Sequence, residues 1–463
     1  MALYVVKTKI SYGEETMIMP STDPDTIFTE LLQGLPIDIV EQAIEFKAFA
    51  RSRKIKSATE LLRVVLMFAG LDLTEREVAA DLILTNPGLG KLSDQAVHKR
   101  LAGCQVWLKA ILPKLIVREE LPSFASGRRI IVVDGTAVAA PGARKASYRL
   151  HVAMDLVSLQ LVSLQITDSK TGESLKHLVI EKGDVFIADR GYARREDVSF
   201  VLKAAGQVIV RYNAHNFPVC DLQGKPIEIA NRLKKLRPGS PTTLAVAFQN
   251  KEGAITPVWV HVLRLSTTEA AKARGRCKRS GQRGGYTPRE ETLLLSEFIV
   301  ILTTIEPSEL SAEAVLNIYR CRWQVELLIK RWKSLLLLDR LRVRQNSPLG
   351  SVYLHGKLLY ALLLDRRLRT RCGEQWARLD QQRDRTWWRL WKLIRQEMAP
   401  IITGVAYWNI TDWAAAIDAL TERKNNRKLQ TIPIIVIMWL QQEKLDAISI
   451  AQSQIKGTTA LAA

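Results

Sequence analysis

The chain has 463 residues, of which 47% are hydrophobic and 25% are charged, and its formal net charge is +20. This composition is typical of a folded globular protein with roughly two to four domains. The basic excess favours a polyanionic partner, most simply nucleic acid, because neutralised phosphates release counterions. No apolar run approaches the ~18 residues of a membrane span, and the first residues lack a signal peptide's long apolar region. We therefore expect no membrane partner.

Cysteine and histidine usage gives no sign of a disulfide framework or a zinc site. The five cysteines are widely spaced, odd in number and contain no CxxC pair. The six histidines are scattered, without an HExxH motif. These patterns indicate a reduced, cytoplasmic protein.

Residues 1–126 are predicted to be mainly helical. An apolar helix pattern covers 58–69, Thr74 and Glu77 form a capping box, and Ser93 is expected to cap a helix at 94–101. Two short helices joined by a Gly-containing turn are typical of helix-turn-helix DNA binding, although any small helical domain has this pattern. We expect this region to contact DNA, mainly because of the net charge.

From residue 129 the pattern changes to α/β. Apolar runs are followed directly by Asp134 and by Asp189, so two carboxylates lie at the C-terminal ends of predicted strands. The predicted elements are strands at 130–133, 148–154, 159–167, 185–188 and 207–212, and a helix at 194–205.

Residues 206–304 are predicted to be mostly β, with strands at 244–248, 258–265 and 293–303. Within them, the Arg- and Gly-rich segment 272–285 is predicted to be a loop that is mobile when free and follows phosphates when DNA is bound. The alternative is a merely solvated charged loop.

The chain after residue 305 is predicted to be helical, including 352–371. Farther along, Trp388 and Trp391 are spaced i,i+3 and so share one helix face. This pair is more typical of core or subunit contact than of a base-stacking platform.

The stretch 318–333 carries the most informative pattern. On a helix, five polar residues lie within roughly 80° of arc, and apolar residues fill the opposite face. The five are Tyr319, Arg322, Glu326, Lys330 and Lys333. One carboxylate among three cations and a phenol is suited to holding a metal ion beside a phosphate. The structural alternative is an ordinary i,i+4 pair between Glu326 and Lys330.

Three carboxylates, Asp134, Asp189 and Glu326, match the needs of phosphodiester chemistry. Two Mg²⁺ ions about 3.5–4 Å apart activate the attacking oxygen and stabilise the leaving one, and Mg²⁺ prefers hard oxygen ligands. Arg322 and Lys333 would keep Glu326 ionised and bind the backbone phosphate.

Each aspartate also has a purely structural interpretation. Asp134-Gly135 is a common turn pair, and Asp189 could cap a turn with Arg190 paired on the surface. The joint occurrence with the helix pattern favours the functional interpretation.

Four separated motifs resemble one known family in their order. They are Asp134; Gly172-Glu173-Ser174; Asp189-Arg190-Gly191-Tyr192; and Tyr319, Arg322, Glu326 and Lys333. This order resembles the DDE transposases of bacterial insertion sequences. More narrowly, it resembles the insertion-sequence-four family, which the Tyr-Arg-Glu-Lys signature defines. The resemblance covers residues 130 to about 340.

The resemblance implies an α/β fold with an RNase H-like catalytic core, interrupted by a mostly β insertion and flanked by helical N- and C-terminal regions. The implied domains are 1–126 (binding the transposon end), 127–205 (core, first part), 206–304 (insertion), 305–372 (core, second part) and 373–463 (a candidate dimerisation region).

The resemblance also implies a mechanism. Asp134, Asp189 and Glu326 would carry two Mg²⁺ or Mn²⁺ ions per active site. A homodimer would pair the terminal inverted repeats of a bacterial element, cut double-stranded DNA with water and join the freed 3′-hydroxyl to target DNA.

Further residues follow from the resemblance. The DNA- and phosphate-binding candidates are Tyr319, Arg322, Lys330, Lys333, Arg190 and Arg211. Phe298, where the best-known relatives have tryptophan, and Trp323 are candidates for base stacking. Two other functions stay open from the sequence: a metal-dependent nuclease of the same fold, and a non-catalytic DNA-binding regulator derived from a transposase.

Overall fold

The structure is a computed structural model. It describes residues 23–33, 35–85, 89–116, 128–143, 145–234, 236, 238–239, 241–344, 347–373 and 387–404.

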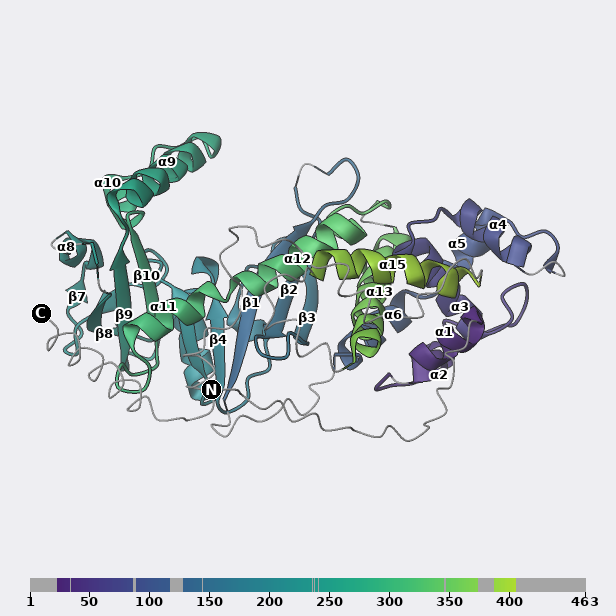
Figure 1. The fold of residues 1–463 in the computed structure, drawn as a ribbon, viewed down its shortest axis with the longest axis horizontal. Coiled ribbons are helices and arrows are strands. Elements are labelled where there is room, and N and C mark those ends of the chain that lie inside the picture. The colour runs from purple at the N-terminus through teal and green to yellow at the C-terminus, as the bar shows by residue number, and fades with distance from the viewer. Residues whose placement is uncertain are drawn as a thin grey trace, which may run out of the picture.

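The N-terminal part is a helical region at one end of the molecule (Figure 1). Its capping box is confirmed: Glu77 accepts from the Thr74 N–H at 2.7 Å, and Thr74 accepts from the Glu77 N–H at 3.2 Å. Ser93 also caps its helix, accepting from the Ala96 N–H at 3.2 Å. The elements are α1 (Pro24–Gln33), α2 (Ile39–Glu45), α3 (Ala58–Val65), η1 (Leu66–Gly70), α4 (Glu75–Thr85), α5 (Asp94–Ala102) and α6 (Gln105–Lys114).

Strands from both central regions join one ten-stranded sheet in the order β3-β2-β1-β4-β5-β10-β9-β8-β6-β7. β1, β4 and β5 are parallel, and every other neighbouring pair is antiparallel. The strands predicted for the insertion therefore extend the core sheet. The strands are β1 (Arg129–Val138), β2 (Tyr148–Asp155), β3 (Leu161–Asp168), β4 (Asp184–Ala188), β5 (Gln207–Arg211), β6 (Val219–Cys220), β7 (Pro226–Ile227), β8 (Thr242–Gln249), β9 (Ile255–Arg264) and β10 (Phe298–Thr303).

Helices cover both faces of this sheet. Along β1, Ile130 and Val132 enter one hydrophobic cluster, and Ile131 and Val133 enter the other, as strand alternation requires. The first cluster contains α11 and α12 and continues into the helical region, whereas the second contains α7. The remaining helices are η3 (Leu175–His177), η4 (Arg190–Tyr192), α7 (Arg195–Lys203), α8 (Ile229–Leu233), α9 (Thr267–Arg283), α10 (Glu290–Leu295), α11 (Ala312–Arg320), α12 (Trp323–Leu336), α13 (Pro348–Cys372) and α15 (Trp387–Thr403).

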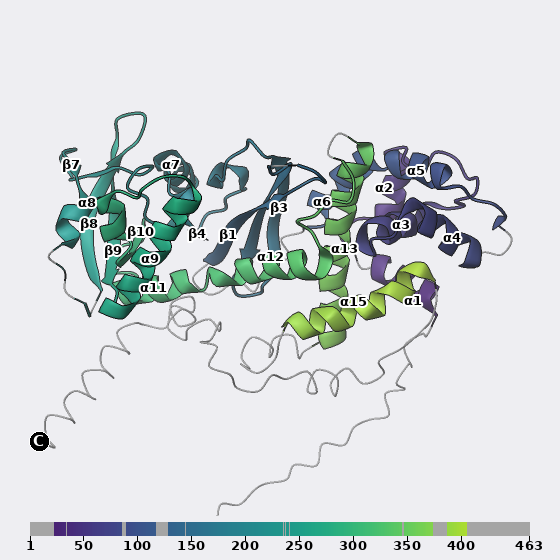
Figure 2. The ribbon, with the colours of Figure 1, turned by 90° about the horizontal axis from the view of Figure 1, so that it is seen from above.

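The long helix α12 crosses the sheet face and reaches toward α13 and α15 (Figures 1 and 2). A buried ion pair fixes its C-terminal end to the helical region. Lys357 of α13 donates to the Asp72 carboxylate and, at 2.7 Å, to the carbonyl of Leu336 in the last turn of α12. Tyr353 donates to the same carboxylate. The three side chains are buried, so this network is part of the core.

The basic segment 272–285 departs from the sequence prediction, because most of it is helical. Ser266 caps α9 by accepting from the Glu269 N–H at 3.4 Å. An ion pair of 2.6 Å between Arg274 Nη1 and Glu297 Oε1 holds the helix to the residue before β10. The capping residue, alanines and arginines favour a helix, and the tertiary ion pair orients it. The predicted strand at 293–303 is also partly wrong, because its first residues belong to α10.

Trp391 is buried, and Trp388 packs on the same cluster, which confirms their expected core role. Most of the predicted dimerisation region 373–463 lies outside the described residues. Within the described ranges, no helix has the length and apolar character needed to cross a membrane.

Candidate active site

The strand register places Asp134 and Asp189 side by side. β1 and β4 run parallel, with Val132 opposite Ile187. Two residues further along each strand, Asp134 comes level with Asp189 on the neighbouring chain segment. Residues at equal level share a sheet face, and neighbouring strands lie about 4.8 Å apart. Both carboxylates therefore extend toward the face that α12 covers.

The structural interpretations of the two aspartates do not hold. Asp134 and Gly135 lie inside β1, opposite Val152 and His151 of β2, so they form no turn. The strand thus continues beyond the end predicted at residue 133. Asp189 precedes η4, but its side chain makes no capping hydrogen bond. Its carboxylate instead accepts from the Tyr319 hydroxyl at 3.4 Å.

Glu326 approaches the same face from the first turn of α12. Val325, Ile329 and Trp332 are buried beneath the helix, as the apolar face predicted. α11 and α12 follow one another with only a turn at Cys321 and Arg322 between them, so the predicted single helix is nearly continuous.

The partner of Glu326 is Arg322, whose Nη2 pairs with the carboxylate Oε1. The i,i+4 pair with Lys330, which was the structural alternative, is absent from the ion pairs of the described residues. Lys330 is exposed and Lys333 is half-buried on the same helix. Both cations therefore remain near Glu326 without neutralising it directly.

The surroundings of Asp134 disfavour the ionised form of its carboxyl. The pKa of this carboxyl is raised to about 6, first by burial and to a smaller extent by the nearby carboxylates of Glu326 and Glu173. Arg322 and the Gly135 N–H, which donates to Asp134 Oδ1 at 2.9 Å, only partly oppose this shift. A bound cation would relieve it.

Arg322 is the central cation of the site. Burial alone would lower its pKa, but interactions with Tyr319 and with the carboxylates of Glu326 and Asp189 outweigh burial and raise the pKa above its usual value. Its Nε–H is buried and has no acceptor in the part of the chain that the structure describes. Arg322 therefore stays charged and keeps one donor for an incoming anion.

Two further guanidinium groups lie beside Asp189. Burial and the neighbouring charge of Arg211 lower the pKa of Arg190, whereas Asp189 raises it. Arg211 ends β5, the strand next to β4. Burial raises the pKa of Tyr319 to about 12, so its hydroxyl keeps its proton and can donate. Four of the six predicted phosphate-binding residues, Tyr319, Arg322, Arg190 and Arg211, thus gather around Asp189.

Glu173 is a site residue that the sequence analysis noted only as part of a motif. A Cβ at Gly191 would lie 2.2 Å from Glu173 Oε2, and one at Gly135 would lie 3.0 Å from Oε1. Glu173 also pairs with Arg149 at 3.5 Å. Its carboxylate thus fills the space between glycines that follow the two aspartates. Those glycines were the available sequence signal.

The two candidate stacking residues differ sharply in exposure. Phe298 is 2% exposed, and the guanidinium of Arg264 lies 5.6 Å from its ring centroid. Its ring is therefore covered, which corrects the prediction of a base-stacking role. Trp323, at the start of α12, is 48% exposed and remains available.

All three carboxylates interact electrostatically with Arg322. They are not close enough together to enclose an ion. Among the described residues, no three His, Cys, Asp or Glu side chains form a group able to hold a metal. The donor set nevertheless fits a hard divalent cation, because it consists of carboxylate oxygens and contains an Asp134 whose ionised form lacks compensation.

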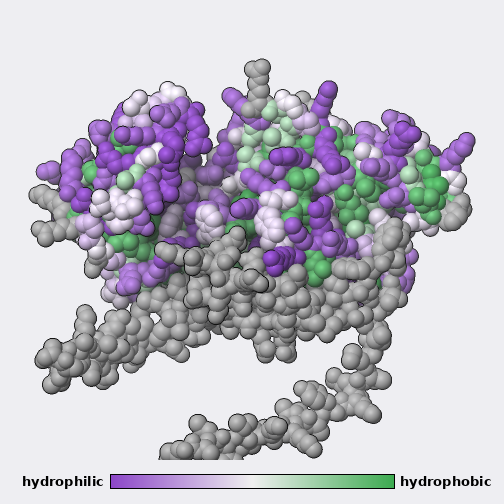
Figure 3. Space-filling model, turned by 45° about the horizontal axis from the view of Figure 1, so that its top comes forward, coloured by the Kyte–Doolittle hydropathy of each residue, from purple (hydrophilic) through white to green (hydrophobic). Residues whose placement is uncertain are grey.

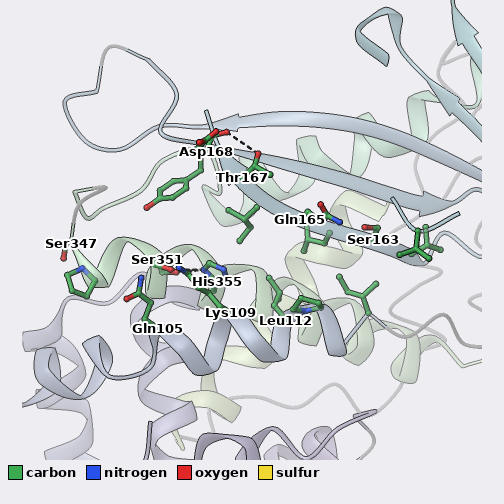
Figure 4. A pocket seen from close by; sticks show the side chains of 18 of the residues that line it. Gln105, Lys109, Leu112, Ser163, Gln165, Thr167, Asp168, Ser347, Ser351 and His355 are labelled. Atoms are coloured by element: carbon green, nitrogen blue, oxygen red, sulfur yellow. Dashed lines mark hydrogen bonds between the residues drawn. The ribbon is translucent and has the colours of Figure 1, made fainter. Parts of the chain in front are cut away.

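A separate pocket opens between α6, β3 and the start of α13 (Figure 4). Lys109, Gln165 and His355 are among its lining residues. Burial lowers the pKa of His355 to about 4, so this histidine is neutral, and its Nδ1 lies 2.8 Å from the Ser351 carbonyl. The pocket lacks the grouped carboxylates and cations found at Asp134.

Comparison with known proteins identifies the family of this chain. Residues 125–348 match the family model described as the transposase DDE domain, a range that includes all three carboxylates. The chain is 32% identical over 338 residues to the putative transposase InsL for insertion sequence element IS186A of Escherichia coli K12, covering 72% of this chain and 90% of that protein.

Two other relatives carry similar names. The transposase for insertion sequence element IS421 of Escherichia coli is 32% identical, over 72% of this chain and 91% of its own length. The transposase for IS231C of Bacillus thuringiensis subsp. berliner is 22% identical, over 47% of this chain and 49% of its own length. The chain belongs to the DDE transposases of insertion sequences, and it is an enzyme.

Proposed function

We propose that this transposase cuts double-stranded DNA at the ends of its element and joins the freed 3′-hydroxyl to target DNA, using an RNase H-like core of the insertion-sequence-four type. The observation that carries the proposal is the level position of Asp134 and Asp189 on the sheet face that α12 covers with Glu326. Phosphoryl transfer between hydroxyl groups needs such a carboxylate set.

Asp134, Asp189 and Glu326 would hold two Mg²⁺ or Mn²⁺ ions. When bound, such ions activate the attacking oxygen and stabilise charge on the leaving oxygen. Arg322 now neutralises Glu326 in part, and the raised pKa of Asp134 indicates that more positive charge is needed.

The chain's own cations would bind and orient the DNA. Arg322 has a buried Nε–H without an acceptor in the described structure, which suits a phosphate oxygen. Arg190, Arg211 and the protonated Tyr319 surround Asp189 and would hold the backbone beside it. Lys330 and Lys333 extend this positive surface along α12.

Element ends must be paired before joining, so we propose that the protein acts as a homodimer on the terminal inverted repeats. The N-terminal helices are proposed to read these repeats. Two short capped helices, α4 and α5, give this region the outline of a helix-turn-helix unit, and α5 carries Lys99 and Arg100 in its last turn.

The test is Asp189→Asn, assayed on duplexes carrying the element's ends. We expect end cleavage to be abolished and DNA binding to be retained, because asparagine keeps the size of the side chain but removes its charge. The matched control is Asp221→Asn, whose side chain accepts turn N–H bonds from Gln223 and Lys225 in a distant loop. Asparagine makes the same bonds, so this control should cleave normally.

Pre-cut ends separate a transposase from a nuclease of the same fold, because only a transposase joins them to target DNA. Normal cleavage by the Asp189→Asn protein would remove Asp189 from the site.

A further inference from the structure

Helix α9 carries a stripe of four basic side chains that the active site does not use. The spacing i, i+4, i+7 and i+11 places them within roughly 60° of arc and over about 16 Å of helix length. All four are exposed, and none takes part in an ion pair with a described residue. We call Lys272, Arg276, Arg279 and Arg283 the α9 stripe.

The opposite side of α9 is fixed to the protein. Arg274 pairs with Glu297 at 2.6 Å. Gly281 is buried, and a Cβ there would lie 2.7 Å from both Pro288 Cδ and the Tyr286 carbonyl. One face of the helix is therefore held by tertiary contacts, and the stripe points away from them.

The stripe lies beside the active site because of the sheet topology. α9 follows the end of β9 and α10 precedes the start of β10, where Arg264 pairs with Phe298. β10 runs antiparallel to β5, so β10 begins on the side of the sheet where β5 ends at Arg211. The proposed catalytic aspartates lie on the same side, at the C-terminal ends of the parallel strands. α9 projects from it as an arm (Figures 1 and 2).

A second observation relates α9 to the site. Cys277, in the middle of α9, lies close enough to Arg190, next to Asp189, to interact with it electrostatically. On a helix, Cys277 lies on the side that also carries Arg274, away from the stripe. The space-filling view shows that hydrophilic residues dominate the surface of the lobe with α9 and α10 (Figure 3).

Isolated in water, the stripe destabilises its own helix, because like charges at i,i+4 repel one another. A polyanion lying along the stripe would remove this repulsion. Each DNA strand carries one phosphate per about 3.4 Å of the duplex axis, so the 16 Å length of the stripe spans about five phosphates of one strand. The spacing of the charges thus suits a regular phosphate backbone.

We propose that the α9 stripe binds the sugar–phosphate backbone of duplex DNA outside the active site, without reading its sequence. The proposal builds on the proposed function, since it concerns how the same DNA is held. Because the stripe faces away from Arg190, it contacts phosphates other than the one that is cut. It therefore contributes to affinity and its salt dependence.

The experiment measures binding of a short fluorescein-labelled duplex of mixed sequence by fluorescence anisotropy, in EDTA and over a series of NaCl concentrations. The variant carries Lys272→Gln, Arg276→Gln, Arg279→Gln and Arg283→Gln. Each lost phosphate contact should reduce the slope of log K against log[salt] by about 0.9, so we expect a reduction of about 2 to 4 and at least about tenfold weaker binding.

The matched control removes the same amount of positive charge from four exposed lysines that lie away from α9, toward the other ends of the strands. It changes Lys182, Lys203, Lys225 and Lys251 to glutamine, and its slope should change by less than about 1. A third variant, with arginines 276, 279 and 283 changed to lysine, keeps the charge and should keep the slope even if the glutamine variant folds poorly.

A slope unchanged in the glutamine variant, or reduced equally in the control, would overturn the proposal. So would loss of the slope in the lysine variant. The measurement needs no divalent metal and no cleavage. Failure of the carboxylate assignment would leave its outcome unaffected, and the Asp189→Asn protein should bind this duplex as the wild type does.

Discussion

Neutralising Asp134 should make the protein more stable while abolishing its activity. Burial, Glu326 and Glu173 together hold the pKa of this carboxyl at about 6, against a usual value of 3.8. The ionised form is therefore disfavoured in the folded state. Asp134→Asn removes the charge and retains an oxygen for the Gly135 N–H, which now donates to Asp134 at 2.9 Å.

The size of the gain follows from the two pKa values. Their difference corresponds to at most about 3 kcal/mol of folding free energy. Because the folded pKa is raised, Asp134 costs nothing below about pH 4, where both states are protonated. The cost grows as the pH rises from about 4 to about 6 and is complete above that range. The stability gain in the variant should follow the same course.

The assay compares thermal and urea unfolding of wild type, Asp134→Asn and the control Asp221→Asn at about pH 4 and about pH 8. We expect the Asp134 variant to exceed the wild type only at the higher pH. MgCl₂ should stabilise the wild type more than this variant, because the ion would offset the same charge. A variant no more stable at pH 8, or equally stabilised at both pH values, would refute the reasoning.

Three further substitutions probe other parts of the site. Gly191→Ala would displace the carboxylate of Glu173, whose Oε2 lies 2.2 Å from the new Cβ. The protein should fold, because a flexible side chain can move, but end cleavage should fall, and the added change Glu173→Ala should remove the clash in a double-mutant cycle. Lys357→Met leaves the buried Asp72 carboxylate without its cation, although the Tyr353 hydroxyl still donates to it, so unfolding measurements should show a loss of about 3–5 kcal/mol. Trp323→Ala should lower stability by only about 1–2 kcal/mol, because half of the ring is exposed, but it should slow end cleavage, and unchanged cleavage would exclude a stacking role.

Local sequence patterns were sufficient for several elements. Capping at Thr74 and Ser93 depends on side chains that reach only three residues along the chain, so the sequence alone predicts it. The buried strands β1 and β4 follow from short apolar runs. The broader family, the DDE transposases of insertion sequences, was also correctly identified from motifs that keep their order in the chain; the narrower insertion-sequence-four assignment stays a prediction.

Long-range contacts decided what the sequence analysis missed. Spacing alone gives Glu326 two i,i+4 cations, and the packed structure pairs it with Arg322, which the sequence analysis also placed beside it, and not with Lys330. The fold buries Phe298, although its position in the chain resembled that of an exposed aromatic residue.

The amino-acid sequence by itself determined the class of enzyme, and it was enough to predict three acidic residues and the surrounding cations as the candidate site. Only the tertiary structure decided that β1 and β4 align Asp134 with Asp189, that Glu173 occupies the space beside Gly135 and Gly191, and that the basic segment forms the arm α9. Strand register, the fit of a side chain against glycine and the anchoring of a charged helix all depend on residues far apart in the chain. Local propensity carries no information about them.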